Sequence, residues 1–420
     1  PFAYYVGGFI NLLGFDSLLS TKLMMGLGML LAGVFMYLLA KEFWGKLGGF
    51  VSAILYVYAP YHALNLYVRG AVSELWAYAF IPLAFLGIYK LLQTHQESAQ
   101  QKKDEKNFLP KQNMWVWGSI AAISYALIII SHNLTAMMVS PLLFLCAFVL
   151  AIRIKKQRIR GSAYLLMSLL LGIILSSFYW LPVAFEMRYT NVLSVVGGGS
   201  DYPDHFVCIS QLLNSPWAYG GSVPGCSDGL SFKIGKLHIL LAALSILPLI
   251  LLRKNKKIST PIALSLLGLL LAIFLTLEYS KFIWDTISLM SFFQFPWRFL
   301  VLVSFFASLV GGAVLLILSG IKRVILCILL VAAIIYINVD VFTPSTIIQK
   351  SSQQYTDSAY IQWDTAKISD EYMPSGFQKP KSKEELPTQK IEIDSKYGTV
   401  ISEESTSQEV RAEILMKQSG

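Results

Sequence analysis

Two apolar runs close to the end of the hydrophobic part of the chain decide the fold. Residues 299–341 read FLVLVSFFASLVGGAVLLILSGIKRVILCILLVAAIIYINVDV. Each run approaches the roughly 20 residues that a helix needs to cross about 30 Å of hydrocarbon. Lys322 and Arg323 near the junction are typical of a short cytoplasmic loop. This stretch therefore predicts two successive transmembrane helices.

The composition of the whole chain points the same way. Its 420 residues are 55% hydrophobic and 14% charged, and the mean hydropathy is +0.58. Soluble domains carry roughly 25% charged residues, and a soluble core cannot use this much apolar surface. The formal net charge of +9 is spread over short loops and not over one amphipathic face. That distribution argues against nucleic-acid binding.

Similar apolar runs recur along the chain and predict an all-α polytopic membrane protein with about ten transmembrane helices. The lipid bilayer is therefore an expected partner, and the plasma membrane is the expected location. The predicted spans cover residues 22–40, 47–60, 75–93, 114–131, 134–152, 162–184, 236–252, 261–279, 298–319 and 322–341.

Basic residues indicate which ends of the spans face the cytoplasm, because Lys and Arg in short loops are retained on that side. When the spans alternate, the basic loops all fall on one side, and they carry Lys41, Lys46, Lys90, Lys102, Lys103, Lys106, Lys111, Arg153, Lys155, Lys156, Arg158, Arg160, Arg253, Lys254, Lys256, Lys257, Lys322 and Arg323. The outer face then receives residues 1–21, 60–74, 131–134, 185–235, 280–297 and the tail from 342.

The chain divides into a predicted transmembrane domain, residues 1–345, and a predicted extracytoplasmic β-rich segment, residues 346–420. Residues 390–394 and 410–415 alternate between apolar and polar side chains as half-buried strands do. The chain starts at Pro1 without an initiator Met and stops just after the second of these patterns. We therefore expect both ends to be truncated.

The long outer loop, residues 185–235, contains Cys208 and Cys226. A disulfide between them would close a loop of about 19 residues and stabilise the protein by about 2–4 kcal/mol. Two unrelated thiols are the alternative. Cys146 and Cys327 fall within predicted spans, where a thiol behaves as a small apolar side chain.

Ionisable residues beside a membrane are costly unless they are paired, hydrated or used, so clusters on the outer face are the candidate site. The first cluster contains Tyr61, His62, Arg69 and Glu74. Arg69 could bind a substrate phosphate through its planar fork while Glu74 holds that fork or handles a proton. Because Arg69 and Glu74 are five residues apart, a loop or helix break must orient them. A purely structural ion pair is the alternative.

Two further clusters supply candidate catalytic groups. His132, in a tight outer hairpin, could act as a general base or bind a phosphate, or it could satisfy backbone groups of the hairpin. Asp201, Asp204 and His205 could bind a divalent cation or supply a base, and a solvated turn explains the same residues. The sequence does not identify a metal or any other cofactor.

Glu186, Arg188 and Arg298 complete the candidate substrate-binding residues. Arg298 follows a predicted amphipathic helix over Lys281–Phe293, which could shape a groove for a lipid-linked ligand whose phosphate meets Arg298. Alternatively, Arg298 extends into the lipid headgroups. The sequence has no Gly-rich nucleotide loop, zinc-ligand spacing or nucleophile elbow. ATP-driven and soluble-hydrolase mechanisms are therefore disfavoured.

Several motifs resemble a family of bacterial membrane proteins. They are Ala59–Tyr61 with Val68–Glu74, Phe178–Pro182 followed by Glu186, Asp204–Val207 with Gln211, Leu212 and Ser215–Trp217, Asp228–Phe232, and Phe295–Phe299. Over most of residues 1–345 the chain resembles the family labelled 6-pyruvoyl-tetrahydropterin synthase-related domain, although it has no pterin-synthase His cluster. That family in turn resembles the GT-C superfamily of integral membrane glycosyltransferases.

The resemblance implies an enzyme that takes a sugar from a polyprenyl-phosphate carrier on the outer face and passes it to a glycan or lipid acceptor of the cell envelope. GT-C enzymes usually place an essential acidic residue in the first outer loop. Residues 1–21 contain only Asp16 as a candidate. We therefore expect the catalytic carboxylate of the family to precede Pro1.

Three functions follow as hypotheses. The first is a membrane glycosyltransferase, supported by the outer ionisable clusters and the resemblance. The second is a transporter or flippase of a lipid-linked or amphiphilic substrate, which predicts polar residues near the bilayer midplane and two related halves. The spans contain mostly Ser, Thr and Gly as polar residues, which favours the first hypothesis over the second. The third is a non-enzymatic scaffold whose C-terminal domain binds envelope partners.

Overall fold

The structure is a computed structural model, and it confirms a predominantly helical, multi-pass membrane fold. It describes residues 1–101, 112–152, 158–192, 201–227, 229–344, 346–357, 360–365, 373–377, 380–385, 391, 393–406 and 409–417. Within these ranges, eight helices are long and apolar enough to cross a membrane. The basic loop residues Lys102, Lys103, Lys106, Lys111, Arg153, Lys155 and Lys156 lie outside the described residues.

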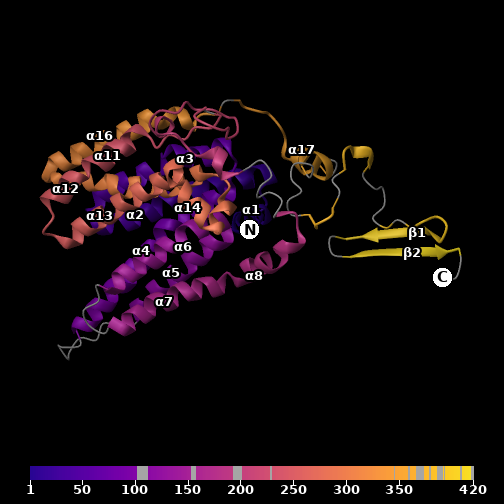
Figure 1. The fold of residues 1–420 in the computed structure, drawn as a ribbon, viewed down its shortest axis with the longest axis horizontal. Helices are drawn as coiled ribbons and strands as arrows, with labels where there is room; N and C mark the ends of the chain where they lie inside the picture. The colour runs from indigo at the N-terminus through magenta and orange to yellow at the C-terminus, as the bar shows by residue number, and fades with distance from the viewer. Residues whose placement is uncertain are drawn as a thin grey trace.

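The helices form one elongated bundle (Figure 1). The longer ones are α1 (Phe2–Leu12), α2 (Ser17–Val57), α4 (Val72–Gln101), α5 (Gln112–Ser131), α6 (Asn133–Ile152), α7 (Arg158–Leu175), α8 (Ser177–Glu186), α13 (Lys256–Thr276), α15 (Leu300–Gly311) and α16 (Gly320–Asn338). The shorter helices with α geometry are α3 (Pro60–Ala63), α10 (Ile209–Leu213), α11 (Lys236–Leu244), α12 (Ile246–Leu251), α14 (Lys281–Thr286) and α17 (Ser352–Thr356).

Single turns of 3-10 or π geometry join these helices. They are η1 (Leu64–Val68), η2 (Met187–Tyr189), η3 (Tyr202–His205), η4 (Glu278–Ser280), η5 (Ser288–Phe293), η6 (Pro296–Phe299), η7 (Gly312–Ile317), η8 (Val339–Phe342), η9 (Tyr360–Thr365) and η11 (Lys383–Glu385). Together η6, α15 and η7 make one continuous apolar span, Pro296–Ile317, most of which is buried inside the bundle.

Helix α2 contains a reversal of the chain at Gly45. This glycine has φ 74° and ψ 179°, a conformation that side-chain-bearing residues rarely adopt. The two halves of α2 then lie side by side: a Cβ added to Gly33 would be 2.8 Å from a methyl of Val57, and one added to Gly49 would be 2.9 Å from Lys41. The two predicted spans 22–40 and 47–60 thus correspond to the two halves of this helix.

Small residues allow α2 to approach the central span closely. A Cβ added to Gly48 would lie 2.9 Å from the carbonyl oxygen of Gly312. The indole of Trp44 and the hydroxyl of Ser52 both donate to the Leu309 carbonyl, at 2.6 Å and 3.0 Å. Small residues and interhelical hydrogen bonds are the usual means of helix association in a bilayer, where hydrophobic burial alone does not favour it.

Two predicted spans are broken in the structure. The 162–184 prediction becomes α7 and α8, separated at Ser176, whose hydroxyl donates to the Gly172 carbonyl at 2.9 Å. The 236–252 prediction becomes α11 and α12, separated at Ser245, whose hydroxyl donates to the Ala242 carbonyl at 2.6 Å. Such side-chain bonds compete with the backbone ladder, and Pro248 removes a helical donor next to the second break.

The predicted amphipathic helix over Lys281–Phe293 is wrong as one continuous element. The chain forms α14 and then η5, because Ile287 adopts extended angles of φ −100° and ψ 97°. Trp284 and Phe293 are buried, so much of the apolar face contacts protein.

The tail contains an antiparallel hairpin of β1 (Gly398–Ser405) and β2 (Val410–Met416). The strand prediction at 410–415 is confirmed. The prediction at 390–394 is wrong at residues 391, 393 and 394, which have no strand structure, whereas 390 and 392 lie outside the described residues. The alternation in β1 is interrupted by a register shift between Val400 and Ser402, which hides this strand from a pattern search.

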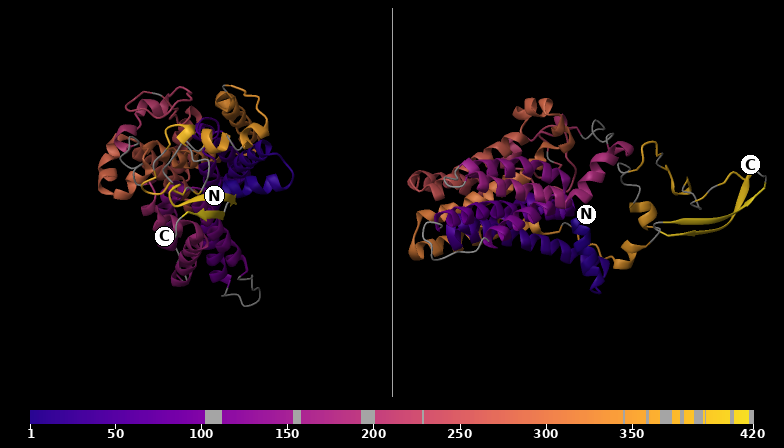
Figure 2. Two further views of the ribbon diagram at one scale, coloured as in Figure 1. Left: turned by 90° about the vertical axis from the view of Figure 1, so that its right-hand side faces the viewer. Right: turned by 90° about the horizontal axis from the view of Figure 1, so that it is seen from below.

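The hairpin projects beyond the bundle at the end where α1, α8 and α17 lie (Figure 1). The C-terminal end of α4 and the N-terminal end of α5 lie at the opposite end. A view from below gives the same arrangement, with the yellow hairpin far from the bundle (Figure 2). The hairpin and these two helix ends therefore lie at opposite ends of the molecule.

Candidate functional site

A buried polar network lies where α3, η1 and α4 meet. Pro60 opens α3, η1 widens the next turn, and Gly70, with φ 59°, reverses the chain before α4 begins. This break brings Arg69 to Glu74, with 2.7 Å between Nη1 and Oε2. The spacing in the sequence predicted that a loop or helix break must orient Arg69 and Glu74, and the structure contains such a break.

The Glu74 carboxylate accepts three hydrogen bonds. Tyr61 donates its hydroxyl to Oε1 at 2.6 Å, and Asn65 donates its side-chain amide to the same oxygen at 3.2 Å. Arg69 supplies the third bond and also donates to the Asn65 side-chain oxygen and, at 3.3 Å, to the Tyr61 hydroxyl. We call these four residues the arginine network.

Burial explains why the network has so many bonds. The Glu74 side chain is 1% exposed and the Arg69 side chain 16% exposed. A charge removed from water is tolerated only when it is paired and hydrogen-bonded. Burial raises the pKa of Tyr61 well above 10, and the nearby charge of Glu74 raises it further. The phenol therefore stays protonated and donates to Glu74. In this arrangement Glu74 orients Arg69 and has little freedom to accept another proton.

A cavity of about 380 Å³ opens beside the arginine network. Its walls come from five separate stretches of the chain and consist of Val68, Arg69, His205, Gly220, Gly221, Ser222, Leu230, Phe295, Trp297 and Arg298. The two charged side chains among them are both arginines. With a neutral imidazole and two aromatic rings beside them, the cavity has the chemistry of a site for an anion that carries an apolar or flat group.

Aromatic rings hold both guanidinium groups. Arg69 lies over the Trp297 ring, 4.7 Å from its centroid, and Arg298 lies over the Phe295 ring at 5.1 Å. The Phe295 and Trp297 rings stack on each other with centroids 5.2 Å apart. Gln294, whose φ of 60° is rare for a side-chain-bearing residue, turns the chain into η6 and so places these rings. Cation–π contacts of this kind restrict where the arginines point.

His205 joins the cavity wall to the long loop. Its Nδ1 lies 2.9 Å from the Ser222 hydroxyl, which also accepts from the Trp297 indole at 3.1 Å. Burial lowers the pKa of His205 below its ordinary value, and the charges of Asp204 and Asp201 oppose that effect. The imidazole is therefore neutral at pH 7 and able to accept a proton.

His132 lies close to the arginine network but does not line the cavity. It precedes α6, where its Nδ1 accepts from the Thr135 backbone at 3.3 Å and bonds the Thr135 hydroxyl at 2.8 Å. Burial lowers its pKa to about 4, the charge of Glu74 opposes this, and Arg298 and Arg69 lower the pKa further. This is a capping role toward backbone N–H groups.

Four other candidates lie away from the cavity walls. His62 is buried, with Nδ1 3.1 Å from the Val57 carbonyl, and its ring packs against Tyr78. Glu186 and Arg188 are at the end of α8 and in η2, and Arg188 donates to the Tyr189 hydroxyl at 2.7 Å. Asp16, the single acidic residue within residues 1–21, caps α2 by accepting from the Leu18 and Leu19 backbones.

Asp201 precedes η3 and Asp204 lies within it, immediately before His205, and neither aspartate lines the cavity. Across the part of the chain that the structure describes, no three His, Cys, Asp or Glu side chains gather to hold a metal ion. The divalent-cation site hypothesised for Asp201, Asp204 and His205 is therefore not formed by these residues together.

Sequence reasoning missed Ser222 and the contribution of Gly220 and Gly221. These small residues lie in a loop without helix or strand, and their only signal is their position between Cys208 and the motif that ends at Phe232. Trp297, which was singled out in the sequence only within the Phe295–Phe299 motif, has a side chain that is 3% exposed and supports Arg69.

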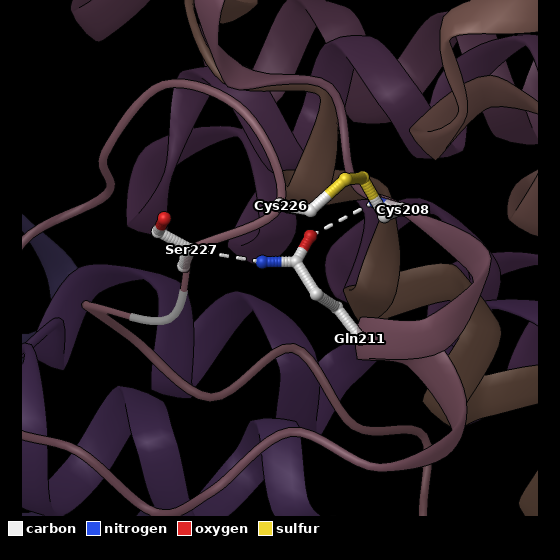
Figure 3. Close-up of a disulfide and its surroundings, with 4 residues drawn as sticks. All are labelled: Cys208, Gln211, Cys226 and Ser227. Atoms are coloured by element: carbon white, nitrogen blue, oxygen red, sulfur yellow. Dashed lines mark hydrogen bonds between the residues drawn. A yellow bond between two sulfur atoms is a disulfide. The ribbon is translucent and has the colours of Figure 1, made fainter.

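A disulfide joins Cys208 to Cys226, with their Cα atoms 5.6 Å apart. The Gln211 side chain lies beside it, accepting from the Cys208 backbone at 2.9 Å and donating to the Ser227 carbonyl at 3.1 Å (Figure 3). The bridge and this glutamine together connect the start and the end of the loop that carries Ser222.

A scan of the chain against models of known protein families finds no match, and a search of curated proteins finds no relative. The resemblance to GT-C glycosyltransferases therefore rests on the sequence motifs alone. Four of these motifs contribute to the cavity: Val68 and Arg69, His205, Leu230, and Phe295 with Trp297 and Arg298.

Proposed function

We propose that this protein is an integral membrane glycosyltransferase that moves a sugar from a polyprenyl-phosphate carrier to a cell-envelope acceptor on the outer face of the plasma membrane. The observation that supports it best is the cavity, where motifs from four distant parts of the chain place Arg69, Arg298 and His205 together. The two arginines suit the phosphate of such a donor, and the apolar helices beside the cavity suit its lipid.

The residues would divide the chemistry as follows. Arg69 and Arg298 hold the donor phosphate and stabilise the negative charge that grows on it as the bond from the sugar to the phosphate breaks. The acceptor hydroxyl forms the new bond to the anomeric carbon, and its proton passes to neutral His205. Glu74 keeps Arg69 oriented throughout, so that little reorganisation is needed during the reaction.

The proposed topology has about ten spans. The reversal at Gly45 supports counting α2 as two spans, and the apolar pair α11 and α12, Lys236–Leu251, would supply another. Arg323 donates to the Trp44 carbonyl at 2.6 Å, which places two predicted cytoplasmic loops side by side. Loop 185–235 and the tail would then lie outside.

The experiment is a transfer assay. Full-length protein in proteoliposomes is given labelled polyprenyl-phosphate sugars and envelope acceptors, and transfer is compared for wild type, Arg298→Ala and Arg188→Ala. Arg188 is the matched control because it is an arginine predicted for the outer face that does not line the cavity. We expect Arg298→Ala to lose about 100-fold or more of the transfer rate and Arg188→Ala to keep it. No transfer by wild type from any donor, or equal loss in both variants, contradicts the proposal.

A further inference from the structure

The loop between Cys208 and Cys226 supplies one wall of the cavity without any regular secondary structure after α10. Gly220 and Gly221 are exposed, and Ser222 is half-buried. The opposite wall, Arg69 with Trp297, belongs to the rigid bundle. One side of the site is therefore fixed by the fold, and the other depends on what holds the loop in place.

Among the residues that the structure describes, three hydrogen bonds hold Gly220 and Ser222, and the neighbouring Tyr219 hydroxyl donates to the Thr343 carbonyl at 3.4 Å. Ser222 contacts His205 and Trp297 through one hydroxyl, and the Gly220 backbone donates to the Gly229 carbonyl at 2.9 Å. The Ser222 hydroxyl is only partly removed from water and Gly220 is exposed, so these bonds contribute modest net stability. A covalent bond that restrains the loop would keep Ser222 on the cavity wall when no ligand is bound.

The start of the loop is anchored firmly. Tyr202 donates to Asp285 of α14 at 2.7 Å and stacks on Trp284, and the Val207 backbone donates to the Thr276 carbonyl at 2.9 Å. The disulfide transfers this anchorage from Cys208 to Cys226, four residues beyond Ser222. Cys226 is exposed, so a reductant can reach the bridge from solvent.

We propose that the Cys208–Cys226 disulfide is a positioning clamp that holds Ser222 on the cavity wall against His205 and Trp297, so that reducing it weakens the binding of anions in the cavity. This inference rests on the proposed function, because it takes a lipid phosphate as the ligand. A closed loop has fewer conformations before the ligand binds, so less conformational entropy is lost on binding. The redox state of Cys208 and Cys226 thereby controls the affinity of the cavity for anions on the outer face.

The test measures the dissociation constant of farnesyl phosphate, used as a short lipid phosphate, for full-length protein in micelles. Cys146 and Cys327 are first replaced by Ala so that the two loop sulfurs are the thiols under study. Four samples are compared: oxidised, reduced, reduced and capped with iodoacetamide, and reduced and bridged again with a dibromomaleimide. The thermal unfolding midpoint of each sample is measured alongside.

We expect reduction and capping to raise the dissociation constant about tenfold, the scale of ordering a few loop residues on binding. Bridging should restore the oxidised value, although it leaves no disulfide. Equal affinity in the oxidised and capped samples overturns the clamp, and so does a bridged sample that binds as weakly as the capped one.

An oxidised Arg298→Ala sample separates this inference from the proposed function. Tight binding by wild type that is lost in Arg298→Ala, together with no effect of reduction, overturns the clamp and leaves the proposed site intact. Absence of binding in every sample, wild type included, overturns both.

Discussion

Glu74 carries a charge that is almost wholly removed from water, and Arg69 is its counter-ion at 2.7 Å. Removing one member of such a pair leaves the other buried without compensation, which costs about 3–5 kcal/mol. We predict that Glu74→Ala lowers the unfolding free energy of the solubilised protein by about this amount. Arg69→Met combined with Glu74→Leu should lose less, because neither charge remains. Thermal unfolding in detergent measures both, and a double variant less stable than Glu74→Ala would contradict an energetic role for the pair.

His132 gives the protein a predictable sensitivity to acid. Its pKa is about 4 in the folded state, chiefly because it is buried, and about 6.5 when unfolded. The unfolded chain therefore takes up a proton first, and stability falls as the pH drops from about 6.5 to about 4, by at most about 3.4 kcal/mol. His132→Asn keeps a side chain that can cap α6 and should reduce this slope. Unfolding midpoints of both proteins at several pH values test this; parallel pH dependence would show that His132 contributes nothing.

The candidate residues could be found from the sequence, but their assembly could not. Arg69 and Glu74 stand out because ionisable groups beside a bilayer are rare, and their spacing indicates a helix break. The link from His205 through Ser222 to Trp297 depends on the path of an irregular loop, which leaves no periodic pattern. Asp201, Asp204 and Glu186 were equally conspicuous in the sequence, yet the structure places none of them on the cavity wall.

At the scale of elements, Gly45 allows α2 to reverse direction, so that its two halves lie side by side. A residue with a side chain loses about 1–3 kcal/mol at this combination of positive φ and extended ψ, which is essentially restricted to glycine. We predict that Gly45→Ala lowers the unfolding midpoint, whereas Gly26→Ala in the same helix leaves it unchanged or raises it slightly, because nothing lies within 4 Å of the added methyl and the backbone is ordinary. Thermal unfolding of the two variants in one detergent gives the comparison. Equal midpoints would mean that the reversal at Gly45 is not required.

Apolar length predicted most of the helices, because crossing the bilayer requires about 20 apolar residues in each span. The breaks within them were not predicted. Ser176 and Ser245 end helices by bonding back to the preceding turn, and a serine in an apolar run carries no such signal on its own. The interrupted alternation in β1 has the same origin, since one local irregularity removes the period on which the prediction depends.

At the scale of the whole molecule, the proposed topology assigns the Gly45 turn and the C-terminal hairpin to opposite sides of the membrane. We predict that an impermeant maleimide labels Ser402→Cys in intact cells lacking an outer barrier, and labels Lys46→Cys only after permeabilisation. Both positions are exposed, and the native cysteines are replaced beforehand. Labelling of both positions in intact cells would rule out the proposed orientation.

The central claim is that the cavity holds the phosphate of a lipid-linked sugar donor, and the most direct test is a profile of glycans and lipid-linked sugars from cells that carry the full-length protein. Wild type is compared with Arg298→Ala and with the control Arg188→Ala at equal membrane abundance. We predict that one sugar decoration disappears and its lipid-linked donor accumulates in Arg298→Ala alone. Unchanged profiles in a folded, abundant Arg298→Ala protein would contradict it.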